Sequence, residues 1–410
     1  MFVNVSSSDD KLRTNVERTE MKSKLFKNIC NQKNKLIEIA DYIYDNPELA
    51  FTEIKASEAL TNLLEENGFE VERGLGSLDT AFRATYEFGE DGPNIGLLCE
   101  YDALPMGHAC GHHMQGPAII GAAVAIKELY KDKPFKLTVY GTPGEEGGGG
   151  KIQMLNDGYI KEIDIAIMMH GGPSTQVDVK SLAADSLTVT FHGKSAHAAL
   201  KPELGRSAFD ALLLTFHAVE FLREHVKEDT RMHYTVLDAG GPANVVPNTA
   251  VGSFSLRSYN SKYLENVLER FNKIVHGASL MTETTYDIVL EKRLDSKIPA
   301  YKLNEIMMYN ARLIDSPAIK PAREKTGSTD FGNVTYLLPG SCIRIAFVDE
   351  SASSHSQEFL NEGKTGRGHE ALVNASKIIA ATVFDLIDTP GVVDEIKNEF
   401  KKTKSMMEIN

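Results

Sequence analysis

The feature that most constrains the fold is a change in the order of predicted elements near Ser181. Before it, strand and helix patterns alternate along the chain. The next stretch of about 110 residues has the order strand, helix, strand, strand, helix, strand, which is typical of a compact, ferredoxin-like βαββαβ domain. From about Asp295 the alternating pattern resumes. The sequence therefore predicts a smaller domain inserted into a larger one.

The larger domain is expected to be α/β, because strands that alternate with helices favour a mixed sheet flanked by helices. Its expected helices are 27–44, 53–67, 115–129 and 371–388, the last as the closing helix, and its expected strands are 80–88, 94–99, 136–140, 163–169 and 342–347. The insertion is expected to have strands at 187–192, 232–238, 251–258 and 285–290 and helices at 207–225 and 262–274. The predicted domains are a flexible N-terminal extension at 1–24, the larger domain at 25–181 and 295–410, and the insertion at 182–294.

Composition limits the partners and the compartment. The formal net charge of -13 argues against binding to nucleic acid or to an anionic membrane, because phosphate binding needs a basic surface. The apolar runs are too short to span a bilayer. Four cysteines in 410 residues do not form a disulfide framework, so we expect a cytoplasmic protein whose partners are small molecules or other subunits.

The first candidate functional cluster follows the strand predicted at 94–99. Cys110 and His112 lie in a loop that also contains Gly107 and Gly111. A free cysteine often packs as a small hydrophobic residue, so Cys110 alone has an ordinary structural explanation. Binding and catalytic side chains, however, are often found on loops at strand ends, which favours a functional role for Cys110 and His112.

The second cluster is a pair of carboxylates, Glu145 and Glu146, followed by the glycines Gly147–Gly150. Neighbouring side chains on an extended loop point apart, so one carboxylate can bind a metal while the other accepts a proton from water. A solvated surface is the alternative explanation of the same pair. A phosphate cradle is disfavoured because no Lys-Ser/Thr pair follows the glycines as in a P-loop.

Two histidines, His170 and His355, also follow predicted strands. Open α/β sheets bind their ligands at the carboxyl ends of strands. With the three candidates Cys110, His112 and Glu146, the chain offers five ligands, which is more than one tetrahedral zinc needs if it is to keep a water. The set suits two divalent ions per chain, with zinc favoured and manganese or cobalt as alternatives.

These motifs resemble those of the aminoacylase and glutamate-carboxypeptidase family of metallopeptidases, clan MH. Within it they are similar to the amidohydrolase branch that includes aminobenzoyl-glutamate hydrolase and auxin-conjugate hydrolases. The resemblance runs from about Lys27 to the C-terminus, and its most specific stretch is Glu100–Pro105 with His108–His112. The other motifs follow in the family's order: Glu145-Glu146, His170, Lys194–Ala198, Asn244–Pro247, Arg257, Ser328–Gly332 and His355.

The resemblance implies a role for each matching residue. Cys110 would bridge two metal ions, and the remaining ligands would be His112, Glu146, His170 and His355. Glu145 would be the general base, and His197 would assist catalysis by holding the substrate's carbonyl oxygen. Substrate binding would involve Asn244, Arg257, Gly327 and Ser328. The family's inserted domain is a lid and a dimerisation domain, and its residues often act across a dimer interface, so a homodimer or a tetramer is implied.

The function that these residues imply is hydrolysis of an amide or peptide bond in a small N-acyl-amino-acid, aminobenzoyl-glutamate-like or dipeptide substrate. A catalytically silent relative that binds a metal or a metabolite is the alternative, and the intact general base Glu145 disfavours it. A thiol enzyme that uses Cys110 is also disfavoured, because no second cysteine forms a Cys-X-X-Cys pair with it.

Two positions depart from the family's pattern. His113 stands where the branch more often has Asp or Asn, which leaves open the group that orients His112. In peptidase members a histidine stands two residues before the aspartate that matches Asp102, whereas this chain has Glu100 at that position. The second difference favours the amidohydrolase branch.

Overall fold

The computed structural model describes residues 6–323 and 325–409, with side chains from residue 16 onward. The chain forms two compact units, each with its own hydrophobic core. Of the described residues, unit 1 consists of 6–179, 298–323 and 337–403, and unit 2 of 180–297, 325–336 and 404–409. We expected 182–294 alone to form the smaller domain.

Two short segments from the C-terminal part of the chain join unit 2 because they bond to it. The backbone N–H of Leu182 donates to Gly327 O at 2.9 Å, which ties segment 325–336 to the beginning of the unit. The side-chain amide of Asn260 donates to Met407 O at 2.7 Å and ties the last residues in the same way. Hydrogen bonds between residues so far apart in sequence leave no pattern in the chain itself.

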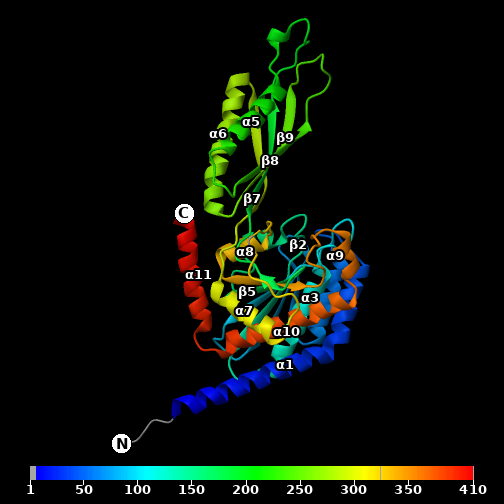
Figure 1. Cartoon of the computed structure of the whole chain (residues 1–410). Helices are drawn as coiled ribbons and strands as arrows, with labels where there is room; N and C mark the ends of the chain where they lie inside the picture. Colours follow the sequence, from blue (N-terminus) through cyan, green and yellow to red (C-terminus); the bar gives the residue numbers. More distant parts are fainter. Residues whose placement is uncertain (1–5, 324, 410) are drawn as a thin grey trace, which may run out of the picture. The chain divides into compact units, whose positions relative to one another are not determined.

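Unit 1 is built on a mixed sheet, of which β2 and β5 are labelled in Figure 1. The sheet has seven strands in the order β1-β2-β4-β3-β5-β11-β6. Its strands are β1 Glu70–Leu75, β2 Leu78–Phe88, β3 Asn94–Cys99, β4 Phe135–Gly141, β5 Ile165–Gly172, β6 Gln176–Val177 and β11 Gly340–Ala346. Strands β4, β3, β5 and β11 are neighbours and run parallel, so their carboxyl ends meet at one edge. All six residues of β3 are buried, as expected for a parallel strand covered on both faces.

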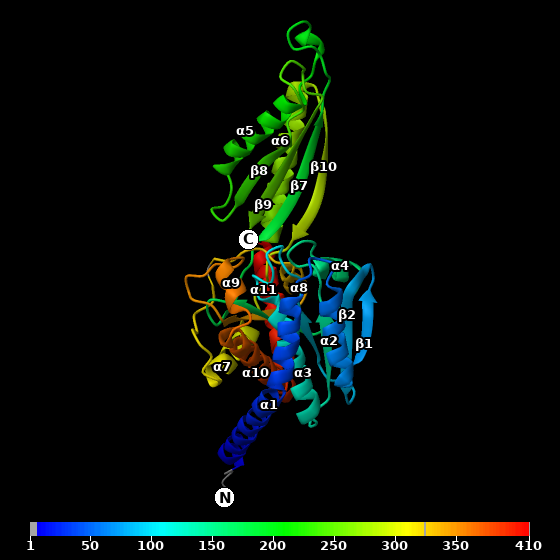
Figure 2. The same ribbon diagram turned by 90° about the vertical axis from the view of Figure 1, so that its right-hand side faces the viewer.

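Three long helices of unit 1, α1, α3 and α10, pack against one another, and α3 and α10 also contact the sheet (Figure 2). Helix α3 is apolar on nearly all sides because it lies between the sheet and these neighbours. The helical bounds outside the insertion are α1 Ser6–Asp45, α2 Ile54–Glu66, η1 His112–Met114, α3 Gln115–Leu129, α4 Gly150–Asn156, α7 Tyr301–Leu313, α8 Phe331–Leu337, α9 Gln357–Glu362, α10 Gly366–Asp388 and α11 Val392–Ile409. Helix α10 is therefore not the closing helix, since α11 follows it.

The segment expected to be a flexible extension, residues 1–24, is helical from Ser6 onward and continues into the rest of α1. Lys22 is buried, and its ammonium donates to Asp385 Oδ2 of α10 at 2.7 Å. Arg18 donates to the other oxygen of the same carboxylate, also at 2.7 Å. Polar residues were the reason for expecting a solvated extension, but two of them, Arg18 and Lys22, bind Asp385 of α10. Residues 1–5 of the expected extension lie outside the described residues.

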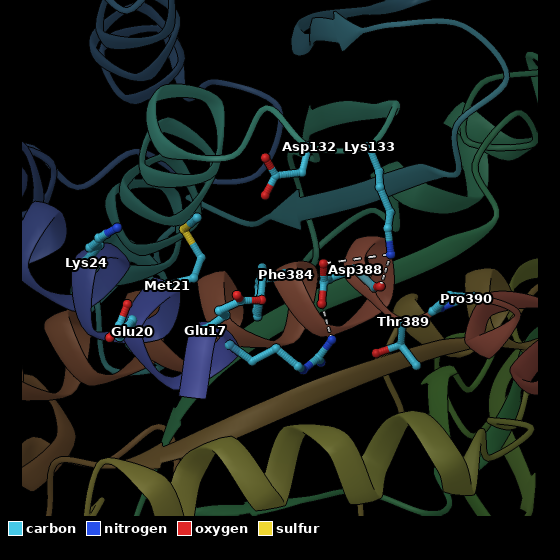
Figure 3. A pocket seen from close by; sticks show the side chains of 11 residues that line it. Glu17, Glu20, Met21, Lys24, Asp132, Lys133, Phe384, Asp388, Thr389 and Pro390 are labelled. Carbon is cyan, nitrogen blue, oxygen red and sulfur yellow. Dashed lines mark hydrogen bonds and ion pairs between the residues drawn. The ribbon is translucent and has the colours of Figure 1, made fainter. Parts of the chain in front are cut away.

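A hollow of about 790 Å³ lies beside this contact, lined by α1, the turn between α3 and β4, and the end of α10 (Figure 3). Side chains of both signs line it, and the carboxylate of Asp388 pairs there with Arg18 and Lys133. The residues around this hollow include none of the predicted ligands or catalytic groups. This hollow is therefore not the candidate site.

Unit 2 contains an antiparallel sheet of order β10-β7-β9-β8, with helices α5 and α6 side by side against it (Figure 2). The bounds are β7 Ala183–His192, α5 Ala208–Arg223, β8 Arg231–Asp238, β9 Thr249–Ser258, α6 Ser261–Thr282 and β10 Thr285–Leu294. Burial alternates residue by residue along β9, as in a strand with one face on a core. The predicted βαββαβ order is confirmed. No helix among the described residues is long and apolar enough to cross a membrane.

Candidate metal centre

The five predicted metal ligands come from the carboxyl ends of four neighbouring parallel strands. Cys110 and His112 follow β3, Glu146 follows β4, His170 lies near the end of β5, and His355 follows β11. The chain runs from β3 to β4 on one side of β3 and then returns to β5 on its other side. This reversal of strand order opens a crevice at the carboxyl ends, where open α/β sheets bind ligands.

The five side chains form one cluster in unit 1. Ligand atoms of Cys110, His112 and Glu146 all lie within 4.8 Å of one another. His355 Nε2 lies 3.1 Å from Glu146 Oε1, and the rings of His112 and His170 have centroids 5.2 Å apart. Two atoms bound to the same tetrahedral ion lie roughly 3.3 Å apart. The spacing of His355 and Glu146 is therefore that of two ligands of one ion.

The orientation of His112 is fixed by Asp102 and not by the neighbouring His113. Asp102 Oδ1 lies 3.0 Å from His112 Nδ1, whereas His113 Nε2 lies 2.9 Å from Gly363 O. With Nδ1 held by a carboxylate, His112 Nε2 is the nitrogen left for a metal. This nitrogen is buried and forms no hydrogen bond. Since buried polar atoms are normally paired, its environment fits a bound cation.

The loop that carries Glu145 and Glu146 is held at two points. The Glu146 N–H donates to Asp102 Oδ2 at 2.8 Å, and the Gly144 N–H donates to the buried carboxylate of Glu53, also at 2.8 Å. Gly144 has a φ of +70°, a conformation that glycine adopts without strain. Glu146 faces Cys110 and His112, and a carboxylate oxygen of Glu145 lies within 4.8 Å of Glu100. The two adjacent carboxylates therefore reach different parts of the cluster.

The electrostatics of the cluster favour a positive charge near His112. Burial lowers the pKa of His112, but its interactions with Cys110, Glu100 and Asp102 outweigh burial and raise this pKa well above its usual value. Burial raises the pKa of the Cys110 thiol to about 11. Burial, together with Arg344 and His112, lowers the pKa of His170 to about 3. His170 is thus neutral, as a metal ligand must be.

Sequence reasoning did not find the charged residues packed behind the ligands. Lys151 is fully buried and pairs with Glu100 at 2.6 Å, beside His112. Arg344 donates to Asp178 Oδ2 at 2.8 Å and lies 3.2 Å from His170 Nδ1. Lys151 lies at the start of a helix and Arg344 in a strand. The residues next to them in the sequence do not show that these two side chains are buried.

The predicted catalytic and substrate-binding residues of the insertion all lie in unit 2, in two groups. His197 and Asn244 are neighbours, because the Ala198 N–H donates to Asn244 O at 3.0 Å. Their loops adjoin the end of the sheet where β7 finishes and β9 begins at Thr249. Arg257 lies near the other end of β9, eight positions later, and at 3.4 Å per residue this separation is roughly 27 Å.

Gly327 and Ser328 lie at the same end of the sheet as Arg257. Gly327 O bonds to Leu182, next to the first residues of β7, and Arg257 pairs with Ala184 of that strand. Ser328 Oγ is buried and has no hydrogen-bond partner. A single copy of unit 2 therefore presents Arg257, Gly327 and Ser328 at one end and His197 with Asn244 at the other.

The fold and the site together define a class of protein. An α/β sheet whose strand ends carry thiol, imidazole and carboxylate side chains, with a second carboxylate beside them, is the arrangement of a metal-dependent hydrolase. The inserted ferredoxin-like unit, with its own four-stranded sheet, is a second feature that characterises this protein.

Comparison with known proteins gives the family. Residues 183–279 match the M20 peptidase dimerisation domain. The chain is 30% identical to a subunit of p-aminobenzoyl-glutamate hydrolase from Escherichia coli, over 89% of this chain and 92% of that protein. It is also 30% identical to the Xaa-Arg dipeptidase of Mus musculus, over 88% and 87% respectively. A dinuclear metal-binding peptidase of the M20 family from Bacillus subtilis has the same fold, with a TM-score of 0.69, 20% identity, and coverage of 87% of this chain and 99% of that one.

The chain belongs to the M20 peptidase family, whose members here are hydrolases of amide and peptide bonds. The resemblance stated from the motifs is thereby confirmed. The predicted fold class, an α/β domain interrupted by a dimerisation domain, is confirmed by the same comparisons.

Replacing Asp102 by Asn tests the orientation of His112. The amide can accept only one of the two hydrogen bonds that the carboxylate accepts from His112 and from the Glu146 N–H. We expect zinc affinity to fall roughly 10- to 100-fold, the usual effect of removing the partner of a metal-binding histidine. Equilibrium dialysis against buffered zinc measures it, with the exposed Asp79→Asn as control. Equal affinity in the two variants would show that Asp102 does not orient the ligand.

Proposed function

We propose that this protein is a dinuclear metallohydrolase that cleaves the amide or peptide bond of a small substrate with a free carboxylate. The observation that carries the proposal is the cluster of Cys110, His112, Glu146, His170 and His355, with Glu145 beside it. The curated relatives act on p-aminobenzoyl-glutamate and on Xaa-Arg dipeptides. N-acyl amino acids, aminobenzoyl-glutamate-like amides and dipeptides are the substrate classes we propose.

Cys110 is the proposed bridge between two divalent ions. The 3.1 Å contact between Glu146 and His355 supports assigning both to one ion, and the packing of His112 on His170 supports assigning these to the other. Thiolate and imidazole ligands favour zinc, with manganese and cobalt as alternatives. When bound, such ions supply Lewis acidity, which makes water a stronger acid and polarises a carbonyl group.

The side chains of this chain supply the proton transfers and the binding. Glu145 accepts a proton from water and then donates it to the leaving amine nitrogen. His197 donates a hydrogen bond to the oxygen that becomes negative as the carbonyl is attacked, a contribution of about 3 to 4 kcal/mol for a good donor. The guanidinium of Arg257 presents a fork of N–H donors suited to a substrate carboxylate.

We further propose that each active site uses residues of two subunits. His197 and Asn244 lie on loops beside Thr249, at the end of β9 that is roughly 27 Å from Arg257, which is farther than a dipeptide can span. Both groups can serve one substrate only if they come from different copies of unit 2. In this arrangement Arg257 acts in its own subunit, and the partner's His197 completes the site.

The surface of unit 2 supports self-association. Strand β8 is at the edge of the sheet, and its side chains Val236 and Leu237 are exposed, by 41% and 59%. On the neighbouring helix α5, Phe221 is 73% exposed. An edge strand with apolar side chains is prone to pair with another chain. A homodimer through this face, or a tetramer that contains it, is the proposed assembly.

We propose that the protein works in the cytoplasm. Its four cysteines are free thiols, which is typical of a reducing compartment. The formal net charge of -13 supports small-molecule substrates over nucleic acid.

Variants of the two adjacent carboxylates should lose different properties, one the hydrolytic activity and the other the bound metal. Glu145→Gln should keep two metal ions per chain and lose about 100-fold or more of the hydrolytic rate, because it removes the general base. Glu146→Gln should lose metal instead. Elemental analysis and hydrolysis of aminobenzoyl-glutamate, N-acyl amino acids and dipeptides measure both properties. A parent protein that binds metal but hydrolyses none of these substrates would contradict the proposed function.

Mixed subunits test whether sites are shared. Glu145→Gln and His197→Ala should each be inactive alone, because one lacks the base and the other the oxyanion donor. After exchange of subunits in an equal mixture, about half of the dimers pair the two variants, and each such dimer has one complete site. Roughly a quarter of the parent activity should return. The control is Glu145→Gln mixed with Arg257→Ala, in which no dimer has a complete site, so this mixture should regain no activity. Equal behaviour of the two mixtures would refute the shared site.

The substrate carboxylate is tested by changing Arg257 to Lys. The parent should hydrolyse an N-acyl amino acid much faster than its carboxamide, and the lysine variant should lose most of that preference, because an ammonium cannot form two parallel bonds to a carboxylate. The ratio of kcat/KM for the two substrates is the measurement. If the lysine variant keeps the full preference, Arg257 does not bind the carboxylate.

A further inference from the structure

A buried ion pair lies against the metal cluster and has no part in the proposed reaction. Lys151 and Glu100 are 0% and 1% exposed, and Lys151 Nζ lies 2.6 Å from Glu100 Oε1. The side-chain amide of Gln115 donates to the other oxygen, Glu100 Oε2, at 2.7 Å. The backbone N–H of Glu100 in turn donates to the Gln115 carbonyl oxygen at 3.1 Å. The carboxylate of Glu100 is thus fixed in one orientation.

This carboxylate faces two of the predicted metal ligands. Ligand atoms of Glu100, His112 and His170 all lie within 4.8 Å of one another. Glu100 Oε2 is 3.2 Å from His112 Nε2, the buried nitrogen that forms no hydrogen bond. This spacing is close to the 3.1 Å between Glu146 and His355, and both match two ligands of one tetrahedral ion, roughly 3.3 Å apart.

The contact needs a cation between the two atoms. Asp102 accepts the proton on His112 Nδ1, so a neutral His112 has a lone pair on Nε2. Glu100 forms an ion pair with the Lys151 ammonium at 2.6 Å, so its carboxylate is anionic. An anionic oxygen and a nitrogen lone pair at this distance repel each other unless a proton or a metal ion lies between them.

We propose that Glu100 is a sixth metal-binding side chain, a ligand of the ion held by His112 and His170, and that Lys151 restrains its strength as a ligand. The proposal rests on the proposed function, because it requires two bound ions. The Lys151 ammonium pairs with Glu100 Oε1, whereas Oε2 accepts one hydrogen bond from Gln115 and has a second lone pair for the ion. The pair adds no net charge to the centre, so the ion gains a ligand while its Lewis acidity is reduced less than by an unpaired carboxylate.

The first test removes the pair without leaving an unpaired buried charge. In the double variant Glu100→Gln/Lys151→Met, one of the two zinc ions should be released roughly 10- to 100-fold more readily, and the other should be held as in the parent. Elemental analysis after dialysis against graded chelator measures the zinc per chain. With cobalt as probe, the absorption spectrum of the affected ion should also change, because its ligand set changes.

The matched control is Lys22→Met/Asp385→Asn. It removes another buried lysine–carboxylate pair of unit 1, between α1 and α10, with side chains 7% and 8% exposed. Its zinc content and cobalt spectrum should equal those of the parent. This control separates an effect on the metal from a general loss of stability.

The single variant Lys151→Met should have the opposite effect to the double variant. Without its cation, Glu100 becomes a stronger ligand, and a positive charge that repels the ion is gone, so the second ion should bind more tightly than in the parent. If Lys151→Met instead weakens zinc binding as the double variant does, the pair acts only by packing and the proposal is overturned. Loss of both ions from the double variant would overturn it too.

A measurement on the unmodified protein keeps the proposal testable if a variant does not fold. In crystals of the zinc-loaded parent, Glu100 Oε2 should lie within roughly 2.2 Å of an ion, and a separation above about 3 Å would overturn the assignment. A parent that takes up no second ion refutes the proposed function itself. Two ions in the parent with unchanged retention in the double variant refute only the role of Glu100.

Discussion

The carboxylate of Asp102 is the interaction on which the candidate site depends. One of its oxygens holds His112 Nδ1 and the other holds the Glu146 N–H, so a single buried side chain joins the loops that follow β3 and β4. These loops carry Cys110 and the carboxylate pair as well. Without this link, two glycine-rich segments would each have many conformations, and the ligands would meet at an entropic cost. The parallel strands bring the loops to one edge, and Asp102 sets their distance.

The charged residues around the centre have partners of opposite charge. Glu100 pairs with Lys151, and Asp178, behind His170, binds both Arg344 and Arg323. Burial favours the neutral forms of Cys110 and His170, whereas the carboxylates of Glu100 and Asp102 next to His112 favour a cation there. Such pairs contribute little to stability compared with apolar residues, which is consistent with a role in the chemistry of the site.

Unit 2 separates its two groups of polar residues by the length of a strand. Strand β9 joins Arg257 at one end to the loop of Asn244 at the other, and an extended strand cannot bend to bring them together. In the proposed function, the ferredoxin-like unit is a spacer that presents one group of residues at each end. The exposed apolar side chains on β8 and α5 would form the interface with a second copy in the proposed dimer.

The sequence by itself indicated the family, the βαββαβ order of the insertion and a set of five candidate ligands, because these residues lie in short motifs at strand ends and each motif is local. Local patterns could not show that residues 6–24 continue α1, since Lys22 finds its partner Asp385 only when α1 packs on α10. They could not single out Lys151, whose partner Glu100 is brought to it by the sheet order β4-β3. Nor could they show that Arg257 and His197 lie apart, because that follows from the strand between them. Tertiary structure decided these features, since each depends on distances between segments that no local pattern contains.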